Sequence, residues 1–163
     1  MSHTTVSSFT RAVHAVFTES GLSGIAVGDF VPRESNTAPS QTFQVSVSVG
    51  IAGGIRGYMF LQSNIAVASE LARELSRVLD VPLDDADEFG PMHRAALAEL
   101  ANQISGRATI YLSERGIDAR ITPPSVLTGS TVTLAVADGL HFYDATISGT
   151  MGTFTLVVGL QEP

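Results

Sequence analysis

The feature that most limits how this chain can fold is a similarity between its two halves. Each half reads as an amphipathic helix, a glycine that ends it, a short apolar run, a loop, and two strands joined by a glycine-containing turn. The corresponding segments, 95 residues apart, are Glu19-Ser20-Gly21 with Glu114-Arg115-Gly116 and Gly57-Tyr58-Met59-Phe60 with Gly152-Thr153-Phe154-Thr155. The pattern predicts an internal repeat, with a chance likeness between two common helix–strand patterns as the alternative.

The repeat predicts one domain over residues 1–163 that is duplicated over about 5–62 and 95–160. A chain of 163 residues is long enough to bury a substantial core of its own. The expected fold class is α/β, in the wider α+β sense, with a mixed or antiparallel sheet and the helices packed on one of its faces.

Hydrophobic periodicity places the individual elements. Apolar positions three and four residues apart predict helices over residues 8–19, 65–79 and 91–115. The expected strands cover residues 24–31, 43–49, 57–62, 117–121, 131–137, 141–148 and 152–160. Gly53-Gly54 predicts a tight hairpin turn. Ser63 or Asn64 suits the start of the second helix, and Pro91 suits the first position of the third.

The composition excludes several classes of function. The chain has no cysteine and no lysine, since all nine basic residues are arginine, and its net charge is −7. Disulfides, thiol nucleophiles, cysteine-bound zinc, Schiff-base chemistry and a P-loop lysine are therefore excluded. A nucleic-acid partner would need a basic surface, so DNA or RNA binding is not expected. An acidic chain instead suits a partner with a basic rim or an exposed lysine.

Other recognisable sites are not expected either. His14, His93 and His141 are too scattered for metal-ligand spacing, and no Gly-x-Ser-x-Gly elbow occurs. The glycines within residues 50–57 lack the Lys-Ser/Thr of a phosphate loop and fit a hairpin better. No apolar run reaches membrane-spanning length, and residues 1–10 lack the apolar region of a signal peptide. We therefore expect a cytoplasmic protein with no membrane partner.

The third predicted helix separates an apolar stripe from a polar surface. The stripe consists of Leu97, Leu100, Ala101, Ile104, Ala108, Tyr111 and Leu112. Glu99 and Asn102 are three residues apart, so they are neighbours on the helix, and they point nearly opposite the stripe. The same side carries small residues, namely Ala95, Gly106, Thr109 and Ser113. Because glycine destabilises a helix interior by about 1 kcal/mol relative to alanine, Gly106 suggests a surface kept low for something to lie on.

A carboxylate beside a carboxamide can carry out a limited range of chemistry. The Asn102 amide is neither a nucleophile nor a useful base, but it can hold and aim a water molecule. The Glu99 carboxylate can pair with a partner's cation or accept a proton. Such a pair suits hydrolysis of a substrate that is already activated, as an acyl phosphate is. The alternative is that Glu-x-x-Asn occurs by chance and that both residues belong to an ordinary solvated helix surface.

The segment Ala98-Glu99-Leu100-Ala101-Asn102-Gln103-Ile104-Ser105-Gly106-Arg107-Ala108 resembles the signature helix of the CheX chemotaxis phosphatases. That family carries Glu-x-x-Asn followed four residues later by glycine, which here are Glu99, Asn102 and Gly106. Residues 121–126 with Gly129 resemble the family's strand and Pro-Pro turn, and residues 57–79 resemble its strand and following helix. The resemblance implies a CheC-like duplicated αβ unit with a six-stranded sheet and long helices, and a homodimer.

The resemblance also implies a function. Members of the family act on the phosphorylated receiver CheY, so a phosphorylated response-regulator receiver is the expected substrate and partner. The receiver brings the phosphoaspartate and its own Mg²⁺, and this chain is expected to need no cofactor or metal. Asn102 would hold a water in line with phosphorus, and Glu99 would pair with the receiver's lysine. The supporting positions would be Ala95, Gln103 and Gly106.

Two features leave alternatives open. At the 95-residue offset Glu99 and Asn102 fall on Thr4 and Ser7, so the resemblance is to members with a single site. Gly90-Pro91, shortly before the pair, could bend or shorten the helix that carries it. A CheX-like module that binds a receiver without catalysis, or a structural dimerisation domain, would present the same surface.

Overall fold

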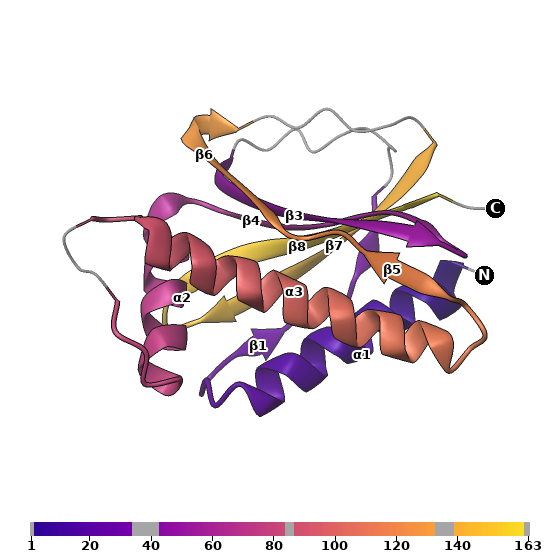
Figure 1. Ribbon diagram of the computed structural model, residues 1–163, viewed down its shortest axis with the longest axis horizontal. Helices are drawn as coiled ribbons and strands as arrows, with labels where there is room; N and C mark the ends of the chain where they lie inside the picture. The colour runs from indigo at the N-terminus through magenta and orange to yellow at the C-terminus, as the bar shows by residue number, and fades with distance from the viewer. Residues whose placement is uncertain (1, 34–42, 84–86, 133–138, 162–163) are drawn as a thin grey trace.

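The computed structural model describes residues 2–33, 43–83, 87–132 and 139–161, which form three helices and eight strands (Figure 1). The helices are α1 (Ser2–Glu19), α2 (Ile65–Val78) and α3 (Pro91–Ser113). The strands are β1 (Ala26–Val27), β2 (Val31–Pro32), β3 (Phe43–Gly53), β4 (Arg56–Ser63), β5 (Ala119–Ile121), β6 (Ser125–Val132), β7 (Leu140–Gly149) and β8 (Gly152–Gln161).

All the strands belong to one antiparallel sheet with the order β1-β7-β8-β4-β3-β5. β2 pairs with β7, the strand that β1 also borders, and β6 pairs with β3, which β5 also borders. The eight strands therefore occupy six positions across the sheet. This confirms the predicted α/β fold class with an antiparallel sheet, although eight strands replace the six expected because each edge position is divided between two segments.

The long central strands form two hairpins, β3–β4 and β7–β8, which pair with each other through β4 and β8. Gly57 lies where this pairing is tightest, since a Cβ atom there would collide with the carbonyl oxygen of Gly159 on β8. A side chain at this position would push the two hairpins apart, so glycine is required by the close approach of the backbones.

The edge strands differ most from expectation. The single strand predicted over residues 24–31 is instead the two short strands β1 and β2. Of the strand predicted over residues 131–137, only residues 131 and 132 are described, and they form the end of β6, which begins earlier than predicted, at Ser125 directly after the Pro-Pro turn. Turn-forming residues such as Gly129 concealed β6 in the sequence, whereas its pairing with β3 specifies it in the structure. Residues 133–137 lie outside the described part.

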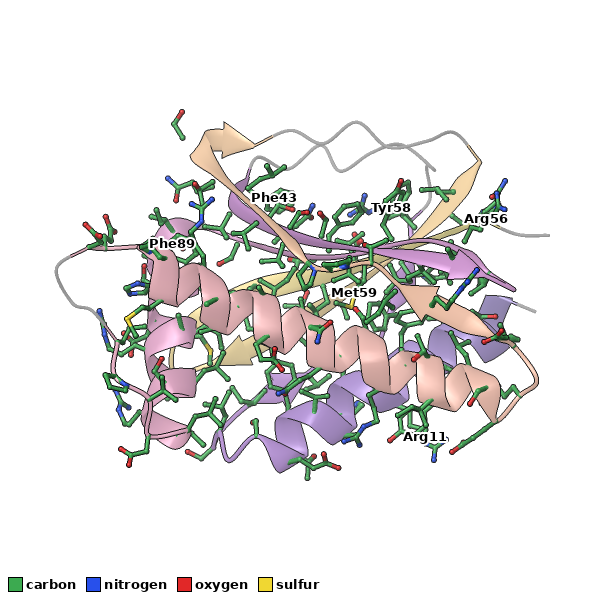
Figure 2. The ribbon with its side chains drawn as sticks, in the orientation of Figure 1. Arg11, Phe43, Arg56, Tyr58, Met59 and Phe89 are labelled. Atoms are coloured by element: carbon green, nitrogen blue, oxygen red, sulfur yellow. The ribbon has the colours of Figure 1, made fainter. Side chains whose placement is uncertain are left out.

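The helices all cover one face of the sheet, as predicted (Figure 1). Figure 2 shows Met59 between the sheet and the helices, whereas Tyr58, the preceding residue on β4, lies on the other face. The alternation follows from the period of a strand. The main core lies on the Met59 side, and a small second cluster on the Tyr58 side consists of Phe60, Leu140, Phe142 and Val157.

Charged contacts fix α1 against α3 along the outer surface of the helix layer. The Arg107 guanidinium donates to both carboxylate oxygens of Glu19, at 3.0 and 2.6 Å. Arg11 pairs with Glu114 at 2.7 Å and lies 3.8 Å from the centre of the Tyr111 ring. The two ion pairs require the helices to run antiparallel. The hydrogen bond from Arg107 holds the pKa of the Glu19 carboxyl below its usual value of 4.5.

The two halves share an element order, since α1-β1-β2-β3-β4 and α3-β5-β6-β7-β8 follow the same sequence and α2 lies between them. In each half the short strands border the long strand of the other half, β7 or β3. A common origin for the halves, over about 5–62 and 95–160, remains a prediction from the sequence.

Candidate functional site

The site is built on α3, and its first turn is fixed by a buried histidine. Pro91 occupies the first helical position, as predicted, and Gly90 precedes it in an extended conformation. The Gly90 backbone N–H donates to Nδ1 of His93 at 3.1 Å, and the His93 side chain is completely buried. Gly90-Pro91 therefore begins the helix and does not bend it: α3 runs without interruption to Ser113, two residues short of the predicted end.

The apolar stripe of α3 holds the helix against the sheet. Six of the seven predicted stripe residues are buried, and the exception is Tyr111, which is half-buried where it contacts Arg11. Leu97, Leu100 and Ile104 are each no more than 3% exposed. Burying side chains of this size stabilises the fold by about 1.5–3 kcal/mol each, so the rotation of α3 about its axis is well determined.

Glu99 and Asn102 lie on the outer side of α3, as the periodicity predicts, but their surroundings differ. Glu99 is exposed, whereas Asn102 is half-buried and not fully exposed as expected. Asn102 borders an open hollow of about 500 Å³ that lies between α3 and the segment at the end of β5. Its lining is formed by Ala95, Ala98, Glu99, Asn102, Ile121, Thr122, Pro123 and Pro124.

The far wall of this hollow, residues 121–124, is held firmly in place. Thr122 exchanges two hydrogen bonds with Gly50 of β3: its N–H donates to the Gly50 carbonyl at 2.9 Å, and its hydroxyl accepts from the Gly50 N–H at 2.8 Å. Arg94 of α3 donates to the carbonyl of Val126 at 3.2 Å and to the Thr128 hydroxyl at 3.0 Å. The hollow beside Asn102 is therefore preformed, and no local pattern in the sequence predicts that residues 121–124 line it.

The small residues around the pair leave the surface low. A Cβ atom added to Gly106 would meet nothing within 4 Å. The hydroxyls of Thr109 and Ser113 are turned back onto the helix, where each donates to the carbonyl three residues before it at 2.7 Å. Ala95 is exposed. These side chains leave room for another molecule to approach the backbone of α3 closely.

Gln103 restricts the position of Glu99. Its side-chain amide donates to Oε1 of Glu99 at 3.2 Å, one helical turn away. The ion pairs formed among the described residues do not involve Glu99, whose carboxylate faces solvent. The arrangement can therefore offer a carboxylate to an external cation and a carboxamide to a water or polar group in the neighbouring hollow.

The described residues also bear on two alternative kinds of site, a metal centre and a membrane span. No group of three or more His, Asp or Glu side chains in that part of the chain is placed to hold a metal ion. None of its helices is long and apolar enough to span a membrane. Among the three histidines considered from sequence, His93 is buried and accepts a hydrogen bond at the start of α3, so it is a packing residue and not a surface residue.

Comparison with known families decides the classification. The family described as chemotaxis phosphatase CheX matches residues 45–148, which is more than half of the chain. The chain belongs to the CheX family. The matched region contains α3 with Glu99, Asn102 and Gly106, and also the Pro-Pro turn beside them. No curated protein sequence matches the chain significantly.

Solved structures support the CheX fold over nearly the whole chain. A CheX protein from Desulfovibrio desulfuricans is 24% identical with a TM-score of 0.78, covering 96% of this chain and 99% of its own. A CheX–CheY–BeF3–Mg complex from Borrelia burgdorferi gives 24% identity and a TM-score of 0.76, covering 96% and 97%. A CheC-like protein from Shewanella oneidensis gives 17% and 0.75, covering 99% and 100%. At these identities the likeness establishes the fold alone.

Proposed function

We propose that this CheX-family protein hydrolyses the phosphoaspartate of a CheY-like response-regulator receiver, with Asn102 and Glu99 as its functional pair. The observation that carries the proposal is the placement of Asn102, which lines a preformed open hollow on a helix surface kept low by Gly106. The CheX family is one of chemotaxis phosphatases, and the Borrelia relative is a complex with CheY, which supports a receiver as partner.

The role proposed for Asn102 is to position the attacking water. Phosphoryl transfer from an aspartyl phosphate needs a nucleophile in line with the leaving oxygen and little covalent help, because the bond is already activated. A carboxamide presents both an acceptor and donors, so it can orient a water without becoming charged. Because Asn102 already holds the water in place, the water loses little further translational freedom in the transition state, and hydrolysis is faster.

The role proposed for Glu99 is to fix the docking of the receiver. Its carboxylate lies beside Asn102, is restrained by Gln103 and is exposed, so it can pair with a lysine at the receiver's phosphorylation pocket. The Mg²⁺ belongs to the receiver in this proposal and neutralises charge on the phosphoryl oxygens there. A homodimer and a cytoplasmic location belong to the same proposal.

The proposal is tested by following loss of acyl phosphate from phosphorylated receivers with the wild type, Asn102→Ala and Asn102→Asp. Removing a group that positions the reacting water should lower the rate about 100- to 1000-fold, which corresponds to about 3–4 kcal/mol of barrier. Asn102→Asp keeps the shape of the side chain but should fail as well, because its charge opposes the phosphoryl oxygens. Circular dichroism should be unchanged, since Asn102 is not part of the core.

Full activity of Asn102→Ala would refute the assignment of this residue. Binding of a phosphorylated receiver by the wild type without any turnover would instead favour the non-catalytic receiver-binding module. If the chain neither binds nor hydrolyses receivers, a structural dimerisation domain becomes the better interpretation.

A further inference from the structure

A second hollow lies on the other side of Glu99 and is lined mainly by apolar side chains. It has a volume of about 290 Å³ and lies between the end of α2 and the first turns of α3. Three of the eight large apolar side chains that are exposed in the described part of the chain line it: Leu79, Val81 and Met92, which are 62%, 49% and 38% exposed. We call it the apolar groove. Its floor includes Leu75 and Leu100.

The backbone conformation at the end of α2 keeps Leu79 and Val81, which line the groove, exposed to solvent. The Val81 N–H donates to the carbonyl of Ser76 at 2.9 Å, which closes the helix with a reversal of the chain. Asp80 occupies the left-handed conformation this reversal needs, with φ of +52°. Leu79 and Val81, on either side of Asp80, are consequently held at the surface by the hydrogen bonds of their own backbone N–H groups. The exposure of their apolar side chains to water does not itself stabilise the fold.

The apolar groove is continuous with the proposed catalytic surface. Ala95 and Glu99 line both the groove and the hollow that contains Asn102, so the two depressions are separated only by this edge of α3. Gln103, which restrains Glu99, borders the groove as well. A protein that reaches Asn102 and pairs with Glu99 must therefore cover the rim of the groove.

The size and charge of this region fit a protein partner. A specific interface covers about 800 Å² on each partner, far more than a carboxylate and a carboxamide provide, and its affinity comes mainly from a few buried apolar or aromatic anchors. Glu99 lines the groove, and the described residues of the segment that borders it, 80–83 and 87–88, carry Asp80, Asp87 and Glu88 and no basic residue. The apolar groove therefore combines a seat for an apolar side chain with an acidic border.

We propose that the apolar groove is the specificity surface for the receiver, which inserts an apolar side chain flanked by basic residues between Leu79 and Met92. This inference rests on the proposed function and adds to it the feature by which one receiver is chosen over others. Asn102 and Glu99 act on groups common to receivers, whereas the groove contacts a side chain that differs among them.

The test measures the affinity for a receiver activated with beryllofluoride, together with single-turnover dephosphorylation at saturating enzyme. The groove variants are Leu79→Ser, at the end of α2, and Met92→Ser, in the first turn of α3. The matched control is Val31→Ser, because Val31 is 61% exposed, close to the 62% of Leu79, but lies on β2 and does not line the groove. Each groove variant should weaken binding about 30-fold, the lower limit expected for an anchor residue, with the saturated turnover rate unchanged.

The outcomes separate this inference from the function on which it rests. If Leu79→Ser and Met92→Ser bind the receiver as tightly as Val31→Ser while Asn102→Ala abolishes turnover, the groove proposal fails and the phosphatase stands. If the wild type binds the receiver but never hydrolyses it, the function fails, and loss of binding in the groove variants still supports the groove. A change of oligomeric state in both groove variants, with receiver affinity retained, overturns the proposal in favour of a second copy of this chain.

Discussion

Replacing Gly106 with alanine should make the protein more stable and less active. Glycine in a helix interior is less favourable than alanine by about 0.8–1.0 kcal/mol, because it loses more backbone freedom on folding. At this position the added methyl group would meet nothing within 4 Å, so no clash offsets the gain. We expect the free energy of unfolding to rise by about 1 kcal/mol, which corresponds to an increase in Tm of about 2–4 °C for a domain of this size.

The matched control is Gly116→Ala, just beyond the end of α3. A Cβ atom there also has nothing within 4 Å, but Gly116 has φ of +78°, a conformation that side chains disfavour. Gly116→Ala should therefore lower the stability by about 1 kcal/mol. Urea unfolding monitored by circular dichroism measures both variants, and the slope of the transition should remain that of the wild type.

The functional effect of Gly106→Ala should have the opposite sign to its effect on stability. If the receiver lies against the backbone of α3, the methyl group intrudes into a packed interface, where an extra methyl typically costs about 1–3 kcal/mol. Dephosphorylation at low enzyme concentration should fall about tenfold, while Gly116→Ala leaves it unchanged. A Gly106→Ala protein that is both stabilised and fully active would show that the low surface of α3 has no role in docking.

Two further predictions concern stability, in addition to those for Asn102 and for the apolar groove. Asp80→Gly should raise the free energy of unfolding by up to about 1 kcal/mol, because glycine adopts the left-handed conformation at φ +52° without strain; a urea midpoint below that of the wild type would contradict this. The pKa of Glu19 is lowered by Arg107, so this carboxylate stabilises the fold above its usual pKa of 4.5 and stops doing so as the pH falls through its lowered pKa. The wild type should consequently exceed Glu19→Gln in stability at pH 6 and lose that advantage in acid, as urea midpoints at a series of pH values would record.

Local patterns in the sequence were sufficient for the helix that carries the site. Six of the seven stripe residues of α3 are buried because the 3.6-residue period depends only on the helix itself, and Pro91 marks the first position because proline is tolerated there. The same holds for the end of β4, where Asn64 caps α2 by accepting the Val67 N–H at 2.8 Å. These features require no information from distant parts of the chain.

The edge of the sheet could not be predicted in the same way. The sequence does not predict a strand over residues 125–130, where turn-forming residues such as Gly129 interrupt the apolar pattern, and they form a strand only because β3 offers an unpaired edge to that segment. The half-burial of Asn102 has the same origin. Its surroundings depend on Pro123 and Pro124, which β5 and the hydrogen bonds between Thr122 and Gly50 bring beside α3.

The sequence by itself determined the helices, the long hairpins and the Glu99–Asn102 pair, because periodicity and spacing act within a few residues. Only the tertiary structure decided that Asn102 lies in a hollow against the Pro-Pro turn, and that Leu79 and Met92, thirteen residues apart, face the same groove. The physical reason is that burial and hollows arise from packing between segments that are distant along the chain. Those contacts depend on the whole fold, so they produce no pattern among neighbouring residues of the sequence.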